Sequence, residues 1–372
     1  MLKPAKLQKL PPVWLVRAIT LFRNALLKLN KNLFPGNVVL YEQFQVFWLL
    51  PSLYIAAKLD IAGFLKNGPR SVHEIAEHTG TNPDSLHRIL RALSSQGIFF
   101  SQKDGRFRLN RISRGLLDEN GSLRYTLLHH LGPVNWNLMS NLMVAVKTGN
   151  DPFTDRYGIS IYDYLQQHPD EYEVFDKSMS NLSDLGLAPI LNAYEFNKYP
   201  TIVDIGGGEG FFLANILMYC PASKGVLFDL PEAIGKSYEL VASFNIADRV
   251  EITTGDFFSD VPASGDLYIL KNIIHNWNDD DCIRLLTTLR RCIKKTARIL
   301  IIDMVVQTPN KLSLAPLLDI QMLACMRGGK ERTKSEFVSI IEKSGFKVLR
   351  LIPTIAPISI FEAAPLISAD NA

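Results

Sequence analysis

Cysteine is scarce in this sequence, and the few cysteines form no recognisable pattern. The 372 residues contain four of them, Cys220, Cys282, Cys292 and Cys325, and no two are spaced as a CxxC pair. Disulfide scaffolds and cysteine-based zinc sites depend on such close, regular spacings. The seven histidines make no cluster with the cysteines either. The sequence therefore predicts reduced thiols in a cytoplasmic protein, with no bound metal.

An excess of charge of one sign is also missing. The 40 lysines and arginines nearly balance the 37 acidic residues, so the formal net charge is only +3. Such a small charge does not require an anionic partner such as nucleic acid. The distribution is uneven, however, because the first acidic residue is Glu42. The basic residues that precede it are Lys3, Lys6, Lys9, Arg17, Arg23, Lys28 and Lys31.

No hydrophobic run is long enough to cross a bilayer. One uncharged, largely apolar stretch, residues 43–57, contains Gln45, Pro51 and Ser52 and falls short of the roughly 20 apolar residues that a spanning helix needs. No small-residue cleavage site follows the basic N-terminus, so we expect neither a secretory signal nor a transmembrane helix. Internal repeats, phosphate loops and nucleophilic triads are absent as well.

Residues 1–36 form a basic leader that is predicted to be an amphipathic helix. Its apolar residues recur at helical spacing, and Pro35-Gly36 ends the pattern. We expect this helix to pack on another subunit; peripheral contact with a membrane surface is the alternative. The apolar face consists of Leu15, Ile19, Phe22, Leu26, Leu29 and Leu33.

Residues 37–115 resemble a winged helix, after an apolar helix predicted over about 41–57. Ser71 caps one helix and Gly80 closes it, and Asn82 starts a second helix that stops at Gly97. A turn at 103–105 then joins two short strands. Transcription factors share this shape, and the second helix carries His87, Arg88 and Arg91. A broader basic surface is lacking, so we expect no nucleic-acid partner.

The rest of the chain divides into a helical connector over 116–195 and an α/β domain over 196–372. Strands alternate with helical patterns in the second part, which predicts a doubly wound, Rossmann-like, mainly parallel sheet. The predicted strands are residues 201–205, 224–228, 250–253, 266–270, 298–305 and 346–352.

A glycine turn follows the first of these strands. Gly206, Gly207 and Gly208 allow the backbone to pass close to a ligand, and the helix that follows offers free N–H groups. The NAD fingerprint would require Gly or Ala where this chain has Phe211. Asp204, at the end of the strand, instead suits a positively charged amino-acid ligand.

Two further acidic residues lie at strand ends. Asp229, at the tip of the second strand, is placed to bind ribose hydroxyls, although capping a helix would also explain it. Asp256 and Phe257, after the third strand, could hold and cover an adenine ring. The order and spacing of the three signals together indicate a nucleoside-containing cofactor.

The whole pattern resembles the small-molecule O-methyltransferases that use S-adenosylmethionine, a group that includes caffeic-acid-type, hydroxyindole-type and bacterial tailoring enzymes. The resemblance covers residues 40–355, and the winged-helix-like segment serves dimerisation in that family. The matching motifs are VDIGGGEG at 203–210, FDLP at 228–231, GDFF at 255–258, LKNIIHNWNDD at 270–280 and GGKERT at 328–333.

The resemblance assigns cofactor roles to residues of these motifs. The three glycines would pass against the methionine portion, with Asp204 beside them. Asp229 and Leu230 would contact the ribose, Asp256 and Phe257 the adenine, and Lys271 a nearby cofactor group.

His275 is the expected general base, because it follows the fourth strand at the ligand-binding edge of the sheet. A neutral imidazole needs an acceptor that orients its other nitrogen. Two carboxylates are candidates, Asp303 and Glu331. The plant enzymes carry glutamate at the position of Asp303, and the shorter side chain favours Glu331 as the direct partner. A surface salt bridge from Glu331 to Lys330 or Arg332 is the structural alternative.

The acceptor site is less well defined. Trp136, Phe175 and Met179 match family positions that line the acceptor pocket, although core packing explains them equally well. Met326-Arg327 stands where plant phenolic enzymes have Asn-Pro, which argues against assuming a phenylpropanoid acceptor. Phenols, polyketides, indoles and hydroxylated carotenoids all stay open.

The sequence therefore predicts a homodimeric O-methyltransferase that methylates a hydroxyl of a small apolar or aromatic metabolite. One alternative is a winged-helix regulator with a ligand-sensing domain. Another is a family member that uses the cofactor for different chemistry, which the presence of His275 disfavours.

Overall fold

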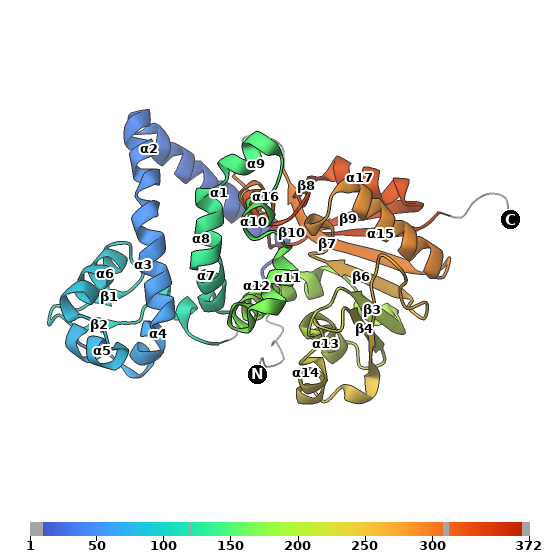
Figure 1. The fold of residues 1–372 in the computed structure, drawn as a ribbon, viewed down its shortest axis with the longest axis horizontal. Helices are drawn as coiled ribbons and strands as arrows, with labels where there is room; N and C mark the ends of the chain where they lie inside the picture. The colour runs from blue at the N-terminus through green and yellow to red at the C-terminus, as the bar shows by residue number, and fades with distance from the viewer. Residues whose placement is uncertain (1–9, 120, 308–311, 367–372) are drawn as a thin grey trace. The chain divides into compact units, whose positions relative to one another are not determined.

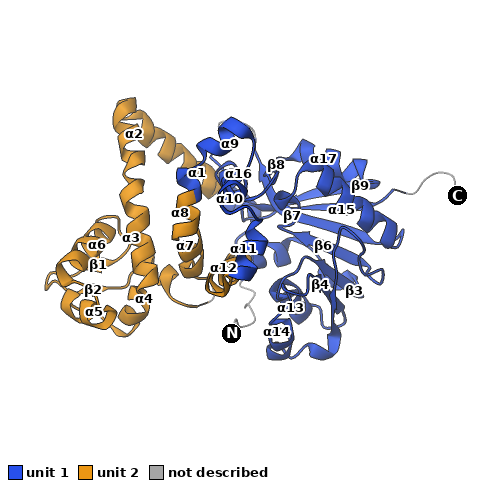
Figure 2. Cartoon of the chain, in the orientation of Figure 1, with its two compact units in different colours: residues 1–17, 138–167, 186–372 blue, residues 18–137, 168–185 orange. Residues whose placement is uncertain are grey.

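The computed structural model describes residues 10–119, 121–307 and 312–366 (Figure 1). The chain divides into two compact units (Figure 2), and each is described by itself. Unit 1 comprises residues 1–17, 138–167 and 186–372, and unit 2 comprises residues 18–137 and 168–185. Both units therefore draw residues from the segment that we predicted as a connector over 116–195.

Unit 2 is a helical assembly with a small hairpin. Helix α1 begins in unit 1 and continues into unit 2, whereas α8 and α12 begin in unit 2 and end in unit 1. The elements of unit 2 are α1 (Val13–Asn32), α2 (Gly36–Phe44), α3 (Val46–Lys58), α4 (Ile61–Phe64), η1 (Leu65–Asn67), α5 (Val72–Thr79), α6 (Pro83–Ser95), β1 (Phe100–Ser101), β2 (Phe107–Arg108), η2 (Ser113–Leu116), α7 (Arg124–His130), α8 (Pro133–Ser140) and α12 (Pro169–Ala193).

The winged-helix prediction is confirmed in its local detail. Ser71 and Glu74 form a reciprocal capping box at the start of α5, and Gly80 ends that helix with a φ of 64°. Asn82 caps α6 by accepting the Ser85 N–H. Strands β1 and β2 pair antiparallel as the wing. Leucines and isoleucines of α3, α5 and α6 close one core, together with Phe99 and Phe107.

The apolar helix predicted over 41–57 is wrong in its bounds, because two helices occupy this stretch. The Pro35 carbonyl accepts the N–H groups of Val38 and Val39, so Pro35 opens α2 as well as following α1. A proline costs little at this position, because an initial helical residue needs no intrahelical N–H bond. In the sequence, Pro35-Gly36 indicated only the end of the leader helix and not the start of a second helix.

Unit 1 is a twisted sheet with helices on both faces. Its strands run in the order β5-β4-β3-β6-β7-β10-β9, and β8 pairs with β7 outside this path. The strands are β3 (Thr201–Ile205), β4 (Lys224–Asp229), β5 (Val250–Thr254), β6 (Leu267–Lys271), β7 (Arg298–Val306), β8 (Arg332–Thr333), β9 (Phe346–Pro353) and β10 (Ile358–Pro365). The helices are α9 (Met143–Thr148), α10 (Pro152–Tyr157), α11 (Ile161–Gln167), η3 (Phe196–Lys198), α13 (Phe211–Tyr219), α14 (Ser237–Ser243), η4 (Ala247–Arg249), η5 (Ile274–Asn276), α15 (Asp279–Cys292), α16 (Ala315–Cys325) and α17 (Lys334–Lys343).

The doubly wound, mainly parallel sheet is confirmed, with two additional strands, β8 and β10. Strand β10 inserts antiparallel between β7 and β9 and was not predicted. Its residues are almost all buried, so it lacks the polar–apolar alternation that marks a half-exposed strand. No helical pattern precedes it, because only residues 354–357 separate it from β9.

Apolar side chains fill both faces of this sheet. Helices α15 and α17 cover one face, and α13, α14 and the end of α12 cover the other (Figure 1). The chain runs outward from β3 through β4 and β5, then returns to β6 and β7 on the other side of β3. The order therefore reverses between β3 and β6, and ligands of such sheets bind at the carboxyl ends of the strands flanking that point.

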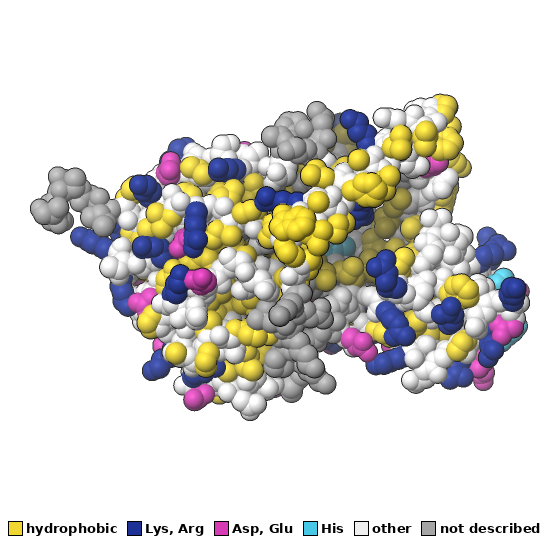
Figure 3. Space-filling view, turned by 180° about the vertical axis from the view of Figure 1, so that it is seen from behind, with side chains coloured by type: hydrophobic (Ala, Val, Ile, Leu, Met, Phe, Trp, Pro, Cys, Tyr) yellow, Lys and Arg dark blue, Asp and Glu magenta, His cyan; other side chains and the backbone are white. Residues whose placement is uncertain are grey.

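Helix α1 covers residues 13–32 of the predicted leader and contains no buried residue, whereas residues 1–9 of that leader lie outside the described residues. Figure 3 shows hydrophobic side chains at the surface along the α1–α2 segment. Among the residues that the structure describes, no single helix is long and apolar enough to cross a membrane. One helix pair bent by 57°, residues 36–58 with 61–67, meets that test by length and composition only. The exposed large apolar side chains of α1 include Trp14, Ile19, Leu21, Phe22, Leu26, Leu27 and Leu29.

Candidate active site

The glycine turn joins β3 to α13 at the point where the strand order reverses. Gly206, Gly208 and Gly210 have φ values of 68°, 57° and 86°, which side chains rarely permit. Gly207 has an ordinary φ but no room for a side chain. A Cβ there would lie 2.5 Å from a Leu227 methyl and 2.8 Å from the Asp204 carboxylate. The sequence therefore lets the backbone itself line the site.

Asp204 is a buried carboxylate without a hydrogen-bond donor for one of its oxygens. Only 2% of the residue is exposed, and its Oδ2 has no partner. Burial raises the pKa of Asp204 to about 7, although the charge of Lys271 opposes this shift. An unsatisfied carboxylate beside a glycine turn suits a ligand that brings a positive charge or N–H donors.

Asp229 ties the tip of β4 to the glycine turn. Its Oδ2 accepts the Gly208 N–H at 2.8 Å, and its Oδ1 accepts the Leu230 N–H at 2.7 Å. Burial raises the pKa of this carboxyl, and the two N–H groups oppose the shift. These two hydrogen bonds tie the strand to the turn and do not cap a helix. Leu230 itself is exposed.

Asp256 and Phe257 follow β5. The Asp256 carboxylate accepts the Phe258 N–H at 2.9 Å and the Ser259 hydroxyl at 3.4 Å, which fixes the turn. The Phe257 ring packs edge-on against Trp277 at 6.1 Å, and its edge lies near the Cα of Gly206, 3.7 Å from where a Cβ would be. An aromatic surface therefore stands beside the glycine turn.

Lys271 ends β6, the strand next to β3. Burial lowers the pKa of this ammonium, and the carboxylates of Asp204 and Asp303 oppose that shift. The charge of Lys271 therefore interacts with both Asp204 and Asp303. Its Nζ also lies 5.5 Å from the centre of the Phe212 ring.

His275 lies in η5, directly after β6, and its side chain is 12% exposed. The Nδ1 atom is 2.8 Å from Oε1 of Glu331 and 3.6 Å from Oδ1 of Asp303. Burial lowers the pKa of His275, but the two carboxylates outweigh burial and the net pKa is raised. With Nδ1 facing a carboxylate, the imidazole is held in the tautomer whose Nε2 is free to accept a proton.

The two carboxylates differ in how they reach the imidazole. Glu331 makes the hydrogen bond, and Asp303 lies beyond hydrogen-bond distance, with both of its oxygens unpartnered. Burial raises the pKa of Asp303 to about 7. The surface salt bridge considered for Glu331 is not present, because its side chain is fully buried and both Lys330 and Arg332 pair with Asp279.

Arg332 was missed as a site residue. Its side chain is fully buried and donates to the carbonyls of Ile274 at 2.9 Å and Trp277 at 2.7 Å, on both sides of His275. The Lys330 N–H donates to the His275 carbonyl at 2.9 Å. The GGKERT segment therefore holds the histidine loop at several points. A buried guanidinium with an acidic partner was not distinguishable in sequence from a surface charge.

Strand β8 explains how Glu331 reaches the histidine. Arg332 of β8 pairs with Val305 of β7, two residues beyond Asp303. The Glu331 N–H donates to Asp319 of α16 at 2.7 Å, which fixes the backbone just before the strand. We name Asp204, Lys271, His275, Asp303 and Glu331 the sheet-edge cluster; all five belong to unit 1.

The predicted acceptor residues are distributed over both units. Trp136 of α8 and Phe175 and Met179 of α12 belong to unit 2, and Met326 follows α16 in unit 1. The Trp136 ring lies 6.2 Å from that of Phe47. Met326 packs close to Gly329, where a Cβ would lie 2.6 Å from that of Met326.

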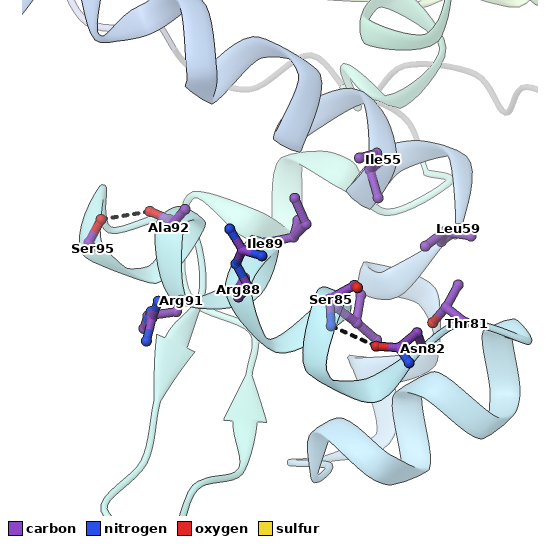
Figure 4. A pocket seen from close by; sticks show the side chains of 11 residues that line it. Ile55, Leu59, Thr81, Asn82, Ser85, Arg88, Ile89, Arg91, Ala92 and Ser95 are labelled. Atoms are coloured by element: carbon purple, nitrogen blue, oxygen red, sulfur yellow. Dashed lines mark hydrogen bonds between the residues drawn. The ribbon is translucent and has the colours of Figure 1, made fainter.

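A groove of about 740 Å³ occupies another part of unit 2, between α3 and α6 (Figure 4). Ile55, Leu59 and Ile89 give it an apolar floor, and Arg88 also lines it. Its lining includes no member of the sheet-edge cluster. Among the described residues, no group of three or more His, Cys, Asp or Glu side chains is arranged to hold a metal ion.

Comparison with known sequences gives matches along most of the chain. The O-methyltransferase domain family matches residues 139–347, and the O-methyltransferase dimerisation domain family matches residues 41–119. Phenazine O-methyltransferase PhzM of Lysobacter antibioticus is 32% identical over 333 residues, covering 89% of this chain and 97% of that protein. The mitomycin biosynthesis 6-O-methyltransferase of Streptomyces lavendulae is 33% identical over 318 residues, covering 85% and 90%.

Solved structures match over similar lengths. The crystal structure of LaPhzM has a TM-score of 0.85 at 32% identity, covering 90% of this chain and all of that chain. The O-methyltransferase NcsB1 from neocarzinostatin biosynthesis, solved with S-adenosylmethionine and 2-hydroxy-5-methyl naphthoic acid, has a TM-score of 0.73 at 26% identity, covering 85% and 96%. The domain match over 139–347 includes every residue of the sheet-edge cluster.

Proposed function

The chain belongs to the S-adenosylmethionine-dependent O-methyltransferase family, and from this premise we propose that it methylates a hydroxyl group of a small apolar or aromatic acceptor with His275 as the general base. The observation that carries the proposal is the 2.8 Å contact between His275 Nδ1 and Glu331, at the end of the strand next to the glycine turn. This contact leaves Nε2 as the proton acceptor.

The residues at the glycine turn fit the cofactor. The unpartnered Oδ2 of Asp204 would accept from the ammonium of its methionine part, and the backbone at Gly206–Gly208 would pass beside it. Asp229 would bind the ribose, with Leu230 beside it, and Asp256 and Phe257 would hold the adenine. The positive charge of Lys271 would favour the ionised form of Asp204. When bound, S-adenosylmethionine supplies an electrophilic methyl group.

The chain's own contribution to the chemistry is alignment and proton removal. His275 Nε2 would take the proton of the acceptor hydroxyl and so make that oxygen nucleophilic toward the methyl group, which the cofactor would release as it becomes S-adenosylhomocysteine. The imidazolium that results is stabilised by Glu331 directly and by Asp303 at 3.6 Å. Arg332 and Lys330 hold the backbone of the histidine loop, so the base stays in place through the reaction.

A labelling experiment tests the proposed reaction. The purified protein would be incubated with methyl-labelled S-adenosylmethionine and extracts of its source organism, and labelled products would be identified by mass spectrometry. We expect label in a methyl ether. Cofactor binding without any transfer, or label on nitrogen or carbon, would contradict hydroxyl methylation.

Self-association is the second part of the proposal. The dimerisation-domain match over 41–119 supports a homodimer built on unit 2, with the helix-turn-helix serving association rather than nucleic-acid binding. The exposed apolar face of α1 adjoins that segment and supports a leader that packs on the second copy. No comparison supports contact with a membrane.

A further inference from the structure

The groove between α3 and α6 is a cavity that the proposed function does not use. Its volume of about 740 Å³ lies within the range of roughly 300–1,000 Å³ that is usual for small-molecule sites. All of its lining residues belong to unit 2, and none belongs to the sheet-edge cluster. The groove is therefore a second candidate binding site, contained within one unit.

The floor of this groove is apolar. Ile55 and Leu59 line it from the α3 side, and Ile89 lines it from the α6 side (Figure 4). These three residues are only partly buried, so unit 2 leaves apolar surface uncovered between the two helices. Ser85 and Ala92 lie on the same face of α6 as Ile89, and their small side chains leave room above the floor. Covering this surface with an apolar ligand would be favourable.

Both charged residues that line the groove are positive. They are Arg88 and Arg91, and no acidic residue lines it. Both arginines are exposed, and neither guanidinium forms an ion pair within the described part of the chain. Since the two residues are three positions apart on α6, their like charges lie close together and repel each other. An anion bound between them would offset this repulsion and accept charge-assisted hydrogen bonds.

The same charges argue against a second copy of the chain as the occupant. Helix α1 of a second copy offers an apolar face, but it contains four basic residues and no acidic one. It would therefore bring more positive charge to Arg88 and Arg91. The α6 helix of a second copy would bring the same two arginines. A small ligand with an apolar body and a negative charge complements both the floor and the arginines.

We propose that the groove between α3 and α6 binds an amphipathic anion, a medium-length apolar chain that ends in a carboxylate. The carboxylate pairs with Arg88 and Arg91, and the chain lies on the apolar floor. Along α6 the lining extends from Ser85 to Ser95, about 15 Å in an α-helix, which accommodates such a chain. This inference goes beyond methyl transfer and does not depend on it.

Calorimetry with the full-length protein and four probes tests the site. Decanoate supplies both the chain and the anion, decan-1-ol supplies the chain alone, acetate supplies the anion alone, and decyltrimethylammonium carries the opposite charge. We expect one decanoate to bind per chain, roughly tenfold more tightly than decan-1-ol, with acetate and decyltrimethylammonium weaker still. Arg88→Gln with Arg91→Gln should lower the affinity for decanoate to that for decan-1-ol.

A second variant changes the charge of the groove without removing an arginine. Ala92→Glu places a carboxylate at an exposed position of α6, so the hydrophobic core is untouched. It should weaken the binding of decanoate and strengthen that of decyltrimethylammonium. The matched control is Lys103→Gln with Arg111→Gln, which removes two exposed positive charges of unit 2 outside the groove and should leave the preference for decanoate unchanged. Thermal unfolding checks that each variant is folded.

Three results would overturn the proposal. The first is equal affinity for decanoate and decan-1-ol, or a preference for decanoate that survives in Arg88→Gln with Arg91→Gln. The second is dissociation of the dimer by Ala92→Glu in light scattering, because a second copy would then occupy the groove. The third is loss of sedimentation with phosphatidylserine vesicles in the arginine variant when decanoate itself does not bind, which would assign the arginines to a membrane surface.

Discussion

At the residue scale, the imidazole of His275 faces two buried carboxylates, which lie at different distances from its Nδ1 atom. Glu331 hydrogen-bonds His275, whereas Asp303 acts across 3.6 Å. Since the net pKa of His275 is raised, the neutral base predominates only above its ordinary pKa of about 6.5. We therefore expect kcat to rise with pH through a limb that lies above 6.5.

Replacing Glu331 by Gln should move this limb to lower pH, because a neutral amide no longer favours the imidazolium. The plateau of kcat should fall by roughly tenfold, since the base is less well oriented and less basic. The pH dependence of kcat for wild type and Glu331→Gln, with Lys330→Gln as a control on the neighbouring residue, measures both effects. An unshifted limb would show that Glu331 does not act through the histidine.

Asp204 makes a different pH-dependent prediction, which concerns stability. Its pKa is raised to about 7 in the folded state, so between pH 4 and pH 7 the folded protein holds a proton that the unfolded chain has lost. Stability without ligand therefore decreases as pH rises across this window. Asp204→Asn should be more stable than wild type by roughly 1–3 kcal/mol at pH 8 and by nothing at pH 4.

The same substitution should weaken cofactor binding at least tenfold, because a charged hydrogen bond to the ligand ammonium is lost. Denaturant unfolding at the two pH values and calorimetry with S-adenosylmethionine provide the two measurements. Equal affinity in Asp204→Asn and wild type would remove Asp204 from the cofactor site.

The side chains that the sequence could locate are those at strand ends. Asp204, Asp229 and His275 follow apolar strands, and parallel strands end at one edge of a sheet, so their proximity was predictable. Arg332 was not, because its burial depends on a fold that brings residue 332 against residues 274 and 277. The preference for Glu331 over Asp303 came from side-chain length, and the distances agree with it.

At the element scale, the parallel strands could be predicted because each is a short apolar run followed by a helical pattern. Strands β8 and β10 could not. Strand β8 has only two residues, and its pairing with β7 joins segments far apart in the sequence. The winged helix was recognisable because Ser71, Gly80 and Asn82 are local capping signals that need no tertiary context.

The glycine turn carries a prediction of its own. Gly207→Val should reduce affinity for S-adenosylmethionine by roughly a hundredfold or more, because its Cβ would push against Leu227 and Asp204 and displace the turn. Gly235→Ala is the control, since nothing lies within 4 Å of the added Cβ and its φ is not positive. Calorimetry compares the two; an unaltered affinity in Gly207→Val would count against this turn as the cofactor site.

At the scale of the whole molecule, the apolar side chains of the leader helix α1 are exposed, so we expect another molecule to cover them. We expect the wild type to be a dimer at micromolar concentration by light scattering. Phe22→Glu with Leu26→Glu should shift it toward monomer, because charges would then face the second copy's apolar surface. Lys28→Gln with Lys31→Gln, on the opposite face, should leave the dimer intact. If the second pair instead abolishes sedimentation with anionic vesicles and the first leaves the dimer unchanged, the leader binds membranes.

The most direct test of the central claim is the turnover of His275→Ala with an acceptor found by labelling. We predict that the variant binds S-adenosylmethionine and acceptor as the wild type does, while kcat at pH 7.5 falls by roughly two to four powers of ten. Activity should partly recover as pH approaches the pKa of the acceptor hydroxyl, since solution then supplies the oxyanion. A His275→Ala enzyme with near-normal turnover at pH 7.5 would contradict the assignment of His275 as the base.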